Sequence, residues 1–256
     1  DCGPAFIGLP QDVQGWVYDY PESFFAPKVH RVRAVLPDPV ELARAAELLK
    51  SAQRPLIIAG GGVQYGDAID TLRVFAETHQ IPVVETIAGR ANLRWDHPLN
   101  CGPLGVTGSD SANNLADKAD VVLCVGTRLQ DFTTGSWSVF GESTQLIKIN
   151  PGRHDALKHQ GVEVIAGAKE SLRPLSEILG EYRSPAGWLD MAASEREAWD
   201  VIRAANTDIN SGPNRYAQAI GVVNALCDAG DRIVTAAGGL PAEVTANWRT
   251  LQESTV

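Results

Sequence analysis

The fold of this chain is decided by residues 54–66, which read RPLIIAGGGVQYG. Four consecutive apolar residues, Leu56–Ala59, are typical of a strand buried on both faces, as in a parallel sheet. The glycines Gly60–Gly62 then allow a turn that needs positive φ and a close approach of one backbone to another. Apolar residues recur at helical spacing beyond them, at Ile69, Leu72, Phe75 and Ala76. The unit therefore predicts strand, glycine turn and helix, the opening of a doubly wound α/β domain.

The segments on either side continue this pattern. Further buried strands are expected at Ile81–Thr86, Asp120–Thr127, Gln145–Asn150 and Val162–Ala166. Helices are expected from Pro39, with Asp38 as the N-cap, from Ser109 or Asp110 as the cap, and over Lys169–Leu179. Strands that alternate with helices predict a parallel sheet covered by helices on both faces, over residues 37–180.

The flanking segments predict further parts. Residues 181–213 are expected to form a linker with a helix over Trp188–Ala205. Residues 214–256 predict a second α/β unit, with a helix from Tyr216, a strand Arg232–Ala237, a glycine turn and a helix opening at Pro241. We expect a piece of a longer protein, because the chain starts at Asp1 and stops after Val256 without a capping signal.

Residues 1–36 predict a short strand, Ala5–Leu9, followed by a connector rich in proline and aromatic residues. This connector lacks sustained periodicity, so we expect no regular element in it. Its aromatic side chains are expected to pack against a neighbouring domain; they are Trp16, Tyr18, Phe24 and Phe25.

Composition limits the classes of function. The chain has 256 residues and a formal charge of −9, with no run rich in Lys or Arg, so neither nucleic acid nor an anionic membrane is expected as a partner. No apolar stretch is long enough to span a bilayer. The four cysteines are scattered without a CxxC pair, which favours reduced, structural thiols and a cytoplasmic protein.

The glycine turn invites comparison with a dinucleotide-binding motif. The GxGxxG spacing fails, because the third glycine should stand at Tyr65 and stands instead at Gly66. Glu85, at the end of the second strand, occupies the position of a ribose-binding acid. We favour a structural turn over a dinucleotide site here.

A polar loop, Arg128–Trp137, follows the longest predicted strand. Ligands of open parallel sheets gather outside the carboxyl ends of the strands. Arg128, Asp131 and Thr134 are therefore candidates to line a cleft. The competing interpretation is a polar loop whose side chains satisfy their own backbone, and the residue types leave both open. His154 and His159 are five residues apart on different helix faces, which favours a solvated turn over a metal site.

Four motifs give the chain a family resemblance: GPAFIGLPQDVQG, RPLIIAGGGVQYG, GVTGSDSANNLADKADVVLCVGTRLQDFTTGSW and VTAAGGLPAEVTANWR. Together they resemble thiamine-diphosphate-dependent enzymes over nearly the whole chain. The branch with the most similar motifs contains hydrolases that open a cyclic polyhydroxylated 1,2-dione in inositol catabolism. GTRLQDFTTGSW and TAAGGLPAE are specific to that branch, whereas GPAFIGLPQDV is shared across the superfamily.

The resemblance implies a domain assignment. Residues 1–36 would be the end of the pyrimidine-binding domain and its connector, residues 37–180 the middle domain, and residues 214–256 the start of the diphosphate-binding domain. It also implies that Gly238, Gly239 and Leu240 approach the diphosphate of the cofactor. The full-length enzyme would use thiamine diphosphate and Mg²⁺ and form a homo-oligomer.

The catalytic groups of such enzymes are expected outside this segment. The glutamate that activates the cofactor would precede residue 1, and the GDG…NN magnesium motif would follow Val256. Neither Gly230-Asp231-Arg232 nor Asn113-Asn114 matches that motif in the right domain. We therefore expect no catalytic residue and no metal ligand in the chain, and no cofactor bound to this fragment alone.

Two alternatives stay open. Flavin-binding relatives of the acetolactate synthase type use the middle domain for FAD, whereas the hydrolases do not need flavin, so FAD is not the expectation here. The chain could instead belong to such a carboligase, or be a module that holds FAD or ADP between Gly60 and Arg128.

Overall fold

The computed structural model describes residues 5–29, 32–212 and 215–256. The chain divides into two compact units, Asp1–Ala34 and Val35–Val256. The division into four parts that the sequence indicates stays a prediction. No helix in the described part is both long and apolar enough to cross a membrane.

The first unit contains two single 3-10 turns, Val13–Gly15 and Glu22–Phe24. The strand expected at Ala5–Leu9 is wrong, since these residues form no ladder. A strand needs a neighbour for its backbone N–H and C=O groups, and the described part of this unit supplies none. Tyr20 packs its ring on Phe24 with centroids 4.9 Å apart, and both rings stay largely exposed. Packing of this unit on a neighbouring domain stays a prediction.

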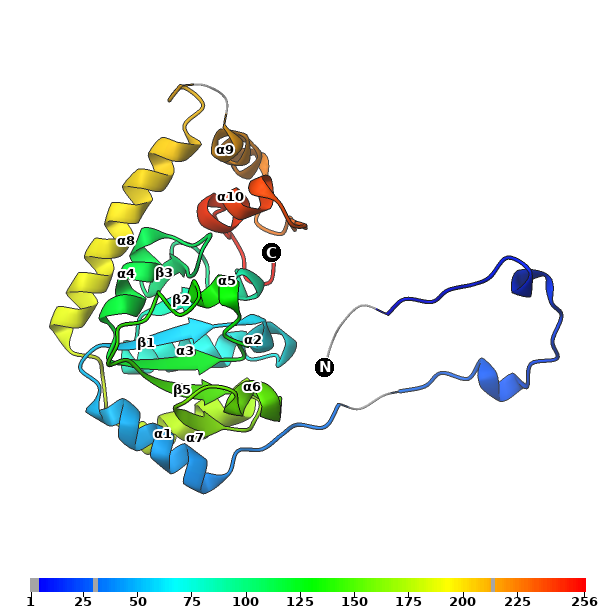
Figure 1. The fold of residues 1–256 in the computed structure, drawn as a ribbon, viewed down its shortest axis with the longest axis horizontal. Coiled ribbons are helices and arrows are strands. Elements are labelled where there is room, and N and C mark those ends of the chain that lie inside the picture. The colour runs from blue at the N-terminus through cyan, green and yellow to red at the C-terminus, as the bar shows by residue number, and fades with distance from the viewer. Residues whose placement is uncertain (1–4, 30–31, 213–214) are drawn as a thin grey trace. The chain divides into compact units, whose positions relative to one another are not determined.

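The second unit is built on one six-stranded parallel sheet (Figure 1). Its strands follow the doubly wound order β3-β2-β1-β4-β5-β6: β2 and β3 are added on one side of β1, and β4, β5 and β6 are added on the other side. The strands are β1 (Pro55–Ala59), β2 (Val83–Glu85), β3 (Asn100–Pro103), β4 (Val121–Val125), β5 (Gln145–Ile149) and β6 (Val162–Val164). All five pairings are parallel, which confirms the predicted fold class.

Strand β3 was not predicted from the sequence. Its residues Asn100-Cys101-Gly102-Pro103 lack an apolar run, and proline and glycine argue against a central strand. The structure places β3 at the edge of the sheet, where its register with β2 shifts between Val83 and Glu85. An edge strand pairs on one side only, which is why it tolerates such a composition.

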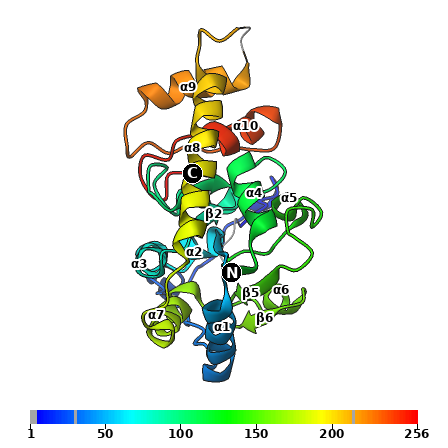
Figure 2. The same cartoon turned by 90° about the vertical axis from the view of Figure 1, so that its left-hand side faces the viewer.

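Helices cover both faces of the sheet, as the two views show (Figures 1 and 2). The helices of the α/β part are α1 (Pro39–Ser51), α2 (Gly61–Tyr65), α3 (Ile69–His79), α4 (Asp110–Lys118), α5 (Asp131–Thr134), α6 (Arg153–Leu157) and α7 (Ala168–Leu179). Helices α1, α3 and α7 pack on one face, and α4 with the start of α8 (Ala186–Thr207) packs on the other.

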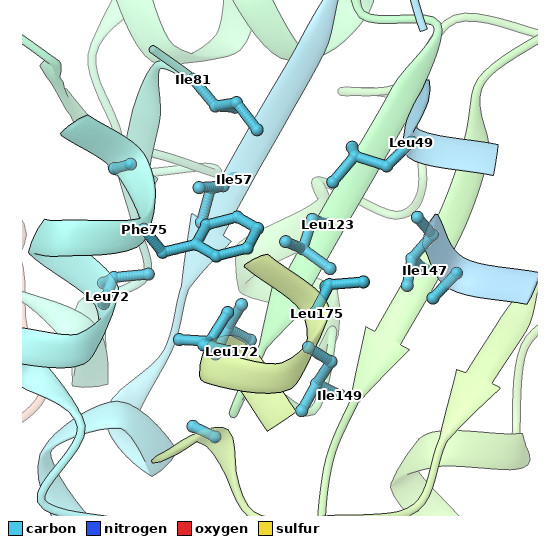
Figure 3. Close-up of a cluster of buried hydrophobic side chains, with 14 of the residues drawn as sticks. Leu49, Ile57, Leu72, Phe75, Ile81, Leu123, Ile147, Ile149, Leu172 and Leu175 are labelled. Carbon is cyan, nitrogen blue, oxygen red and sulfur yellow. The ribbon is translucent and has the colours of Figure 1, made fainter. Parts of the chain in front are cut away.

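The buried strands divide their side chains between two cores. In β1, Ile57 faces the core of α1, α3 and α7, while Leu56 and Ile58 face the core of α4 and α8. Figure 3 shows the first core, in which Phe75 of α3 and Leu172 of α7 converge on the strands. Burying each large side chain stabilises the fold by about 1.5–3 kcal/mol. The continuous apolar runs follow from burial on both faces.

The predicted helix caps are present. Asp38 accepts hydrogen bonds from the amides of Val40 and Glu41 at 2.7 and 3.4 Å. Ser109, rather than Asp110, caps α4, because its hydroxyl accepts from the Ala112 amide at 3.1 Å.

After the sheet, the chain continues through three helices: α8 (Ala186–Thr207), α9 (Tyr216–Leu226) and α10 (Gly239–Asn247). The start of α8 is fixed by the Trp188 indole, which donates to the carbonyl of Pro55 at 2.7 Å. The strand expected at Arg232–Ala237 is wrong, because this segment has no ladder partner among the described residues. Its apolar Val234 is 93% exposed.

Candidate functional site

The carboxyl edge of the sheet is closed at the point where the strand order reverses. The amide of Gly62 donates to the carbonyl of Gly126 at 2.9 Å, and the amide of Gly60 donates to Val125 at 2.9 Å. A Cβ atom on Gly62 would lie 2.7 Å from the Cα of Gly126. The predicted close backbone approach is therefore confirmed.

The predicted positive φ in the glycine turn is wrong. Gly60 has a φ of −102°, and Gly61 and Gly62 belong to α2. The left-handed residue is Gly126, across the turn, with a φ of +60°. The helix begins directly after Gly60, so the chain needs no reversal there, and the sharp change of direction falls after β4.

Glu85, the residue in the position of a ribose-binding acid, is engaged inside the protein. Its carboxylate is fully buried, pairs with the Arg90 guanidinium and accepts from the Leu93 amide at 3.0 Å. Burial raises the pKa of Glu85, and the charge of Arg90 opposes that shift. Arg90 also donates to the carbonyl of Trp248 at 2.8 Å, so the pair joins the sheet edge to the segment after α10.

The loop after β4 places its three candidate residues differently. Arg128 is exposed. Asp131 is exposed and accepts from the Ser136 hydroxyl at 2.8 Å. Thr134 is fully buried; its hydroxyl donates to the Gln130 carbonyl at 3.2 Å and accepts from the Trp137 amide at 3.3 Å. Thr134 therefore holds the loop, whereas Arg128 and Asp131 lie on its surface.

This loop has an unusual backbone. Leu129, Ser136 and Trp137 have φ values of +46°, +54° and +69°, and Gly135 lies at +53°. Left-handed conformations of non-glycine residues cost about 1–2 kcal/mol each, so the surrounding contacts must hold them. The Trp137 ring packs on His159 with centroids 4.2 Å apart. Burial of His159 lowers its pKa, in keeping with a packing role for this imidazole.

The turn at Gly238 begins α10. Gly238 has a φ of +138°, and Gly238, Gly239 and Leu240 are all exposed. A Cβ atom on Gly239 would lie 3.3 Å from the Tyr216 ring. The first turn of a helix presents free N–H groups and a partial positive charge, which fit an anionic diphosphate. Within residues 5–29, 32–212 and 215–256, no three His, Cys, Asp or Glu side chains gather closely enough to hold a metal ion.

Both asparagines of Asn113-Asn114 have structural roles. Asn113 accepts from the Gly105 amide at 2.9 Å and donates to its carbonyl at 3.1 Å. Asn114 donates to Glu195 at 2.9 Å. These contacts hold the chain after β3 and the middle of α8.

Sequence reasoning missed Arg90 and the arginines around it. Arg90, Arg196, Arg203 and Arg249 line one cavity although they come from three separate segments. The available signal was weak: a lone arginine in IAGRAN, five residues after Glu85, and Arg196 and Arg203 seven residues apart on one helix face.

Comparison with known proteins agrees with this architecture. The family model described as the central domain of thiamine pyrophosphate enzymes matches residues 42–175. This range covers strands β1–β6 and most of the flanking helices. The chain therefore belongs to the thiamine pyrophosphate enzyme family.

Similar proteins carry a more specific name. The chain is 37% identical, over its whole length, to a 3D-(3,5/4)-trihydroxycyclohexane-1,2-dione hydrolase of Bacillus anthracis, and covers 44% of that protein. It is 38% identical to the enzyme of that name from Geobacillus thermodenitrificans, with 97% of the chain and 42% of the relative covered. The Bacillus thuringiensis enzyme is also 38% identical, with 100% and 44% covered. The chain thus spans less than half the length of these relatives.

Proposed function

We propose that this chain is part of a thiamine-diphosphate-dependent hydrolase that cleaves a C–C bond in a cyclic polyhydroxylated 1,2-dione during inositol catabolism. The observation that carries the proposal is the 37–38% identity to relatives named 3D-(3,5/4)-trihydroxycyclohexane-1,2-dione hydrolases, which extends through the linker and α10. The sheet alone would support only the family.

The cofactor, when bound, supplies an electron sink for cleavage of the C–C bond. The contribution proposed for this chain is at the start of α10, where Gly238, Gly239 and Leu240 would lie against the diphosphate. An exposed glycine with positive φ lets the backbone approach an anion closely. The activating glutamate and the Mg²⁺ ligands are proposed to lie in parts of the enzyme outside these 256 residues.

Arg128 and Asp131 are proposed to help line the substrate cleft. A polyol dione needs hydrogen-bond partners for several hydroxyl groups, and a site that pairs them discriminates against analogues that lack them. Thr134 would act indirectly, by holding the left-handed backbone of the loop. Arg128 is the residue to substitute first in a test of this proposal, since it is exposed and carries a full charge.

We propose that the middle domain works without a flavin. The Gly60 and Gly62 amides are bonded to Val125 and Gly126, and Glu85 is paired with Arg90. These are the groups that a dinucleotide would require. The proposed protein is cytoplasmic and homo-oligomeric, with a small-molecule substrate and neither nucleic acid nor membrane as partner.

The test uses the full-length enzyme that contains this chain, supplied with thiamine diphosphate and Mg²⁺. The cyclic dione and pyruvate are offered separately, and the acid product is followed by chromatography. We expect ring opening and no acetolactate. Turnover of pyruvate without ring opening would replace the hydrolase with the acetolactate-synthase-like carboligase.

Two further measurements refine the result. Arg128→Ala should lower kcat/KM about tenfold or more with an unchanged Tm, whereas the exposed Arg153→Ala should change neither. A loss of Tm in Arg128→Ala would assign a structural role instead. Flavin absorbance, or nucleotide released on heating, would support the FAD or ADP module and contradict a flavin-free domain.

A further inference from the structure

A cavity lined by four arginines lies away from the turn at Gly238 that we propose to approach the cofactor. Its volume is about 40 Å³, and it is lined by β3, the β2–β3 connection, one face of α8, the end of α10 and the segment after it. This is room for a few water molecules or one small oxyanion. Trp248, on its wall, follows the carboxyl end of α10, roughly 15 Å along the helix axis from Gly238.

Four arginines line this cavity, and their partners do not balance their charge. Arg90 pairs with Glu85, and Arg203 donates to Asp200 at 3.0 Å. Among the residues that the structure describes, Arg196 donates only to the carbonyl of His97, at 3.0 Å. Arg249 has no hydrogen-bonded acceptor for its guanidinium among the described residues. Two of the four guanidiniums thus have a carboxylate partner among the described residues, which leaves two positive charges without an ion pair.

The guanidiniums also have unused donors. The Nε atoms of Arg90, Arg196 and Arg249 are buried and have no hydrogen-bond partner in the described part of the chain. A buried polar atom without a partner is costly, more so when it carries charge. These three donors belong to guanidiniums that line one cavity, and an acceptor bound beside them would offset this cost.

The cluster is held in place before any ligand arrives. Arg249 and Arg203 stack on the Trp95 ring, with Cζ atoms 4.5 and 5.3 Å from its centroid. The backbone of Arg249 is fixed by Asn224, which accepts from its amide at 2.9 Å and donates to its carbonyl at 3.1 Å. Burial, followed by the charge of Arg203, lowers the pKa of Arg249, and a nearby anion would oppose this shift by stabilising the charged guanidinium.

We propose that this cavity binds a phosphate-type oxyanion, either free inorganic phosphate or the phosphate group of a small metabolite. Planar guanidiniums match the oxygens of phosphate with paired hydrogen bonds, and a dianion matches the excess charge. Because the site joins the sheet, α8 and the segment after α10, its ligand would fix the linker region against the α/β domain.

The test is a titration of this chain with inorganic phosphate at constant ionic strength, followed by Tm and tryptophan fluorescence. We expect a saturable rise in Tm and a fluorescence change, since Trp95, Trp199 and Trp248 line the cavity. Glycerol phosphate in a parallel titration separates the two sources: tighter binding than phosphate assigns a metabolite, and weaker binding assigns the free ion.

Variants locate the effect. Arg249→Met should raise the half-saturating phosphate concentration at least tenfold. Arg249→Lys should raise that concentration less, because lysine keeps the positive charge and loses only the paired hydrogen-bond donors of the guanidinium. Arg196→Met is the second probe if Arg249→Met melts too low to titrate. Arg153→Met, at an exposed site on α6, is the control and should titrate like the unaltered chain.

Three results would overturn the proposal. They are a lack of saturation in the unaltered chain, an unchanged titration in both cavity variants, and a loss of response in the Arg153→Met control. Acetate acting at the same concentration as phosphate would replace the phosphate assignment with a carboxylate site. None of these results depends on hydrolase activity. A failure of the phosphate proposal would therefore leave the proposed hydrolase function untouched.

Discussion

The amide of Gly62 donates to the carbonyl oxygen of Gly126 across 2.9 Å, joining the turns that follow β1 and β4. This contact lies at the point where a doubly wound sheet ordinarily opens a crevice for a ligand. Here the two backbones meet directly. The glycines therefore serve packing at the switch point.

Gly62→Ala should lower the free energy of unfolding by about 2 kcal/mol or more. The added Cβ would lie 2.7 Å from the Cα of Gly126 and 2.8 Å from the carbonyl oxygen of Gly126. Backbone atoms cannot move aside as a side chain can. Urea denaturation followed by circular dichroism gives the change in free energy of unfolding. Gly187→Ala is the control: Gly187 is exposed in α8 with no atom near its added Cβ, so alanine should stabilise by about 0.5–1 kcal/mol. Equal effects at both positions would contradict the packed turn.

Glu85→Gln should destabilise the fold by about 3–5 kcal/mol, because it leaves the buried Arg90 without its counter-ion. The double variant Glu85→Gln, Arg90→Met should recover much of that loss. The exposed pair of Arg94 and Asp96 provides the comparison, and Asp96→Asn should cost less than about 1 kcal/mol. Additive losses in the double variant would show that the two buried residues do not interact.

The stability of the protein should fall below pH 6.5, and His79 should account for part of the fall. Its ring is fully buried, Nδ1 donates to the Tyr182 carbonyl at 2.8 Å, and Nε2 accepts from the Ser176 hydroxyl at 2.8 Å. Burial lowers the pKa of His79, so the unfolded chain takes up a proton near pH 6.5 while the native protein does not. Between those two pKa values stability is lost at up to about 1.4 kcal/mol per pH unit as the pH decreases.

Urea midpoints at several pH values measure this slope. His79→Gln should make the slope shallower, while the exposed His154→Gln should leave it unchanged. A slope that His79→Gln does not alter would assign the acid sensitivity to other groups.

The thiols of Cys101 and Cys124 should resist alkylation in the native protein. Both are buried, and burial raises the pKa of each to about 12, so the reactive thiolate is scarce as well as inaccessible. Cys227 is only partly buried and should be modified first. Peptide mass spectrometry after iodoacetamide treatment distinguishes the sites; Cys2 lies outside the described residues. Modification of Cys101 at the rate of Cys227 would contradict the buried position of β3.

Titration of this chain alone with thiamine diphosphate and Mg²⁺ should give no saturable heat. The turn at Gly238 offers backbone donors only, and a diphosphate also needs a metal to neutralise its charge. Isothermal titration calorimetry measures this directly. Micromolar binding would mean that these 256 residues hold more of the cofactor site than we propose.

The sequence by itself determined strands β1, β2, β4, β5 and β6 and the longer helices that flank them. Continuous apolar runs such as Leu56–Ala59 and Val121–Val125 have one stable place, a strand buried on both faces, and they confirm the doubly wound fold. Local signals also specified the cap at Asp38 and the helix expected over Trp188–Ala205, which the structure has as α8.

Only the tertiary structure decided the rest. β3 has no apolar run and exists because β2 offers it a free edge. Arg232–Ala237 carries the apolar Ile233 and Val234 but forms no strand, because it has no ladder partner in the described part of the chain. Glu85 occupies the sequence position of a ribose-binding acid, but in the folded protein its carboxylate forms a buried ion pair with Arg90. Arg196 and Arg249 are far apart in the chain, and no local pattern marks two guanidiniums that meet across a cavity. Strand pairing and charge clustering are long-range contacts, so their positions follow from the packed fold rather than from the spacing of residues.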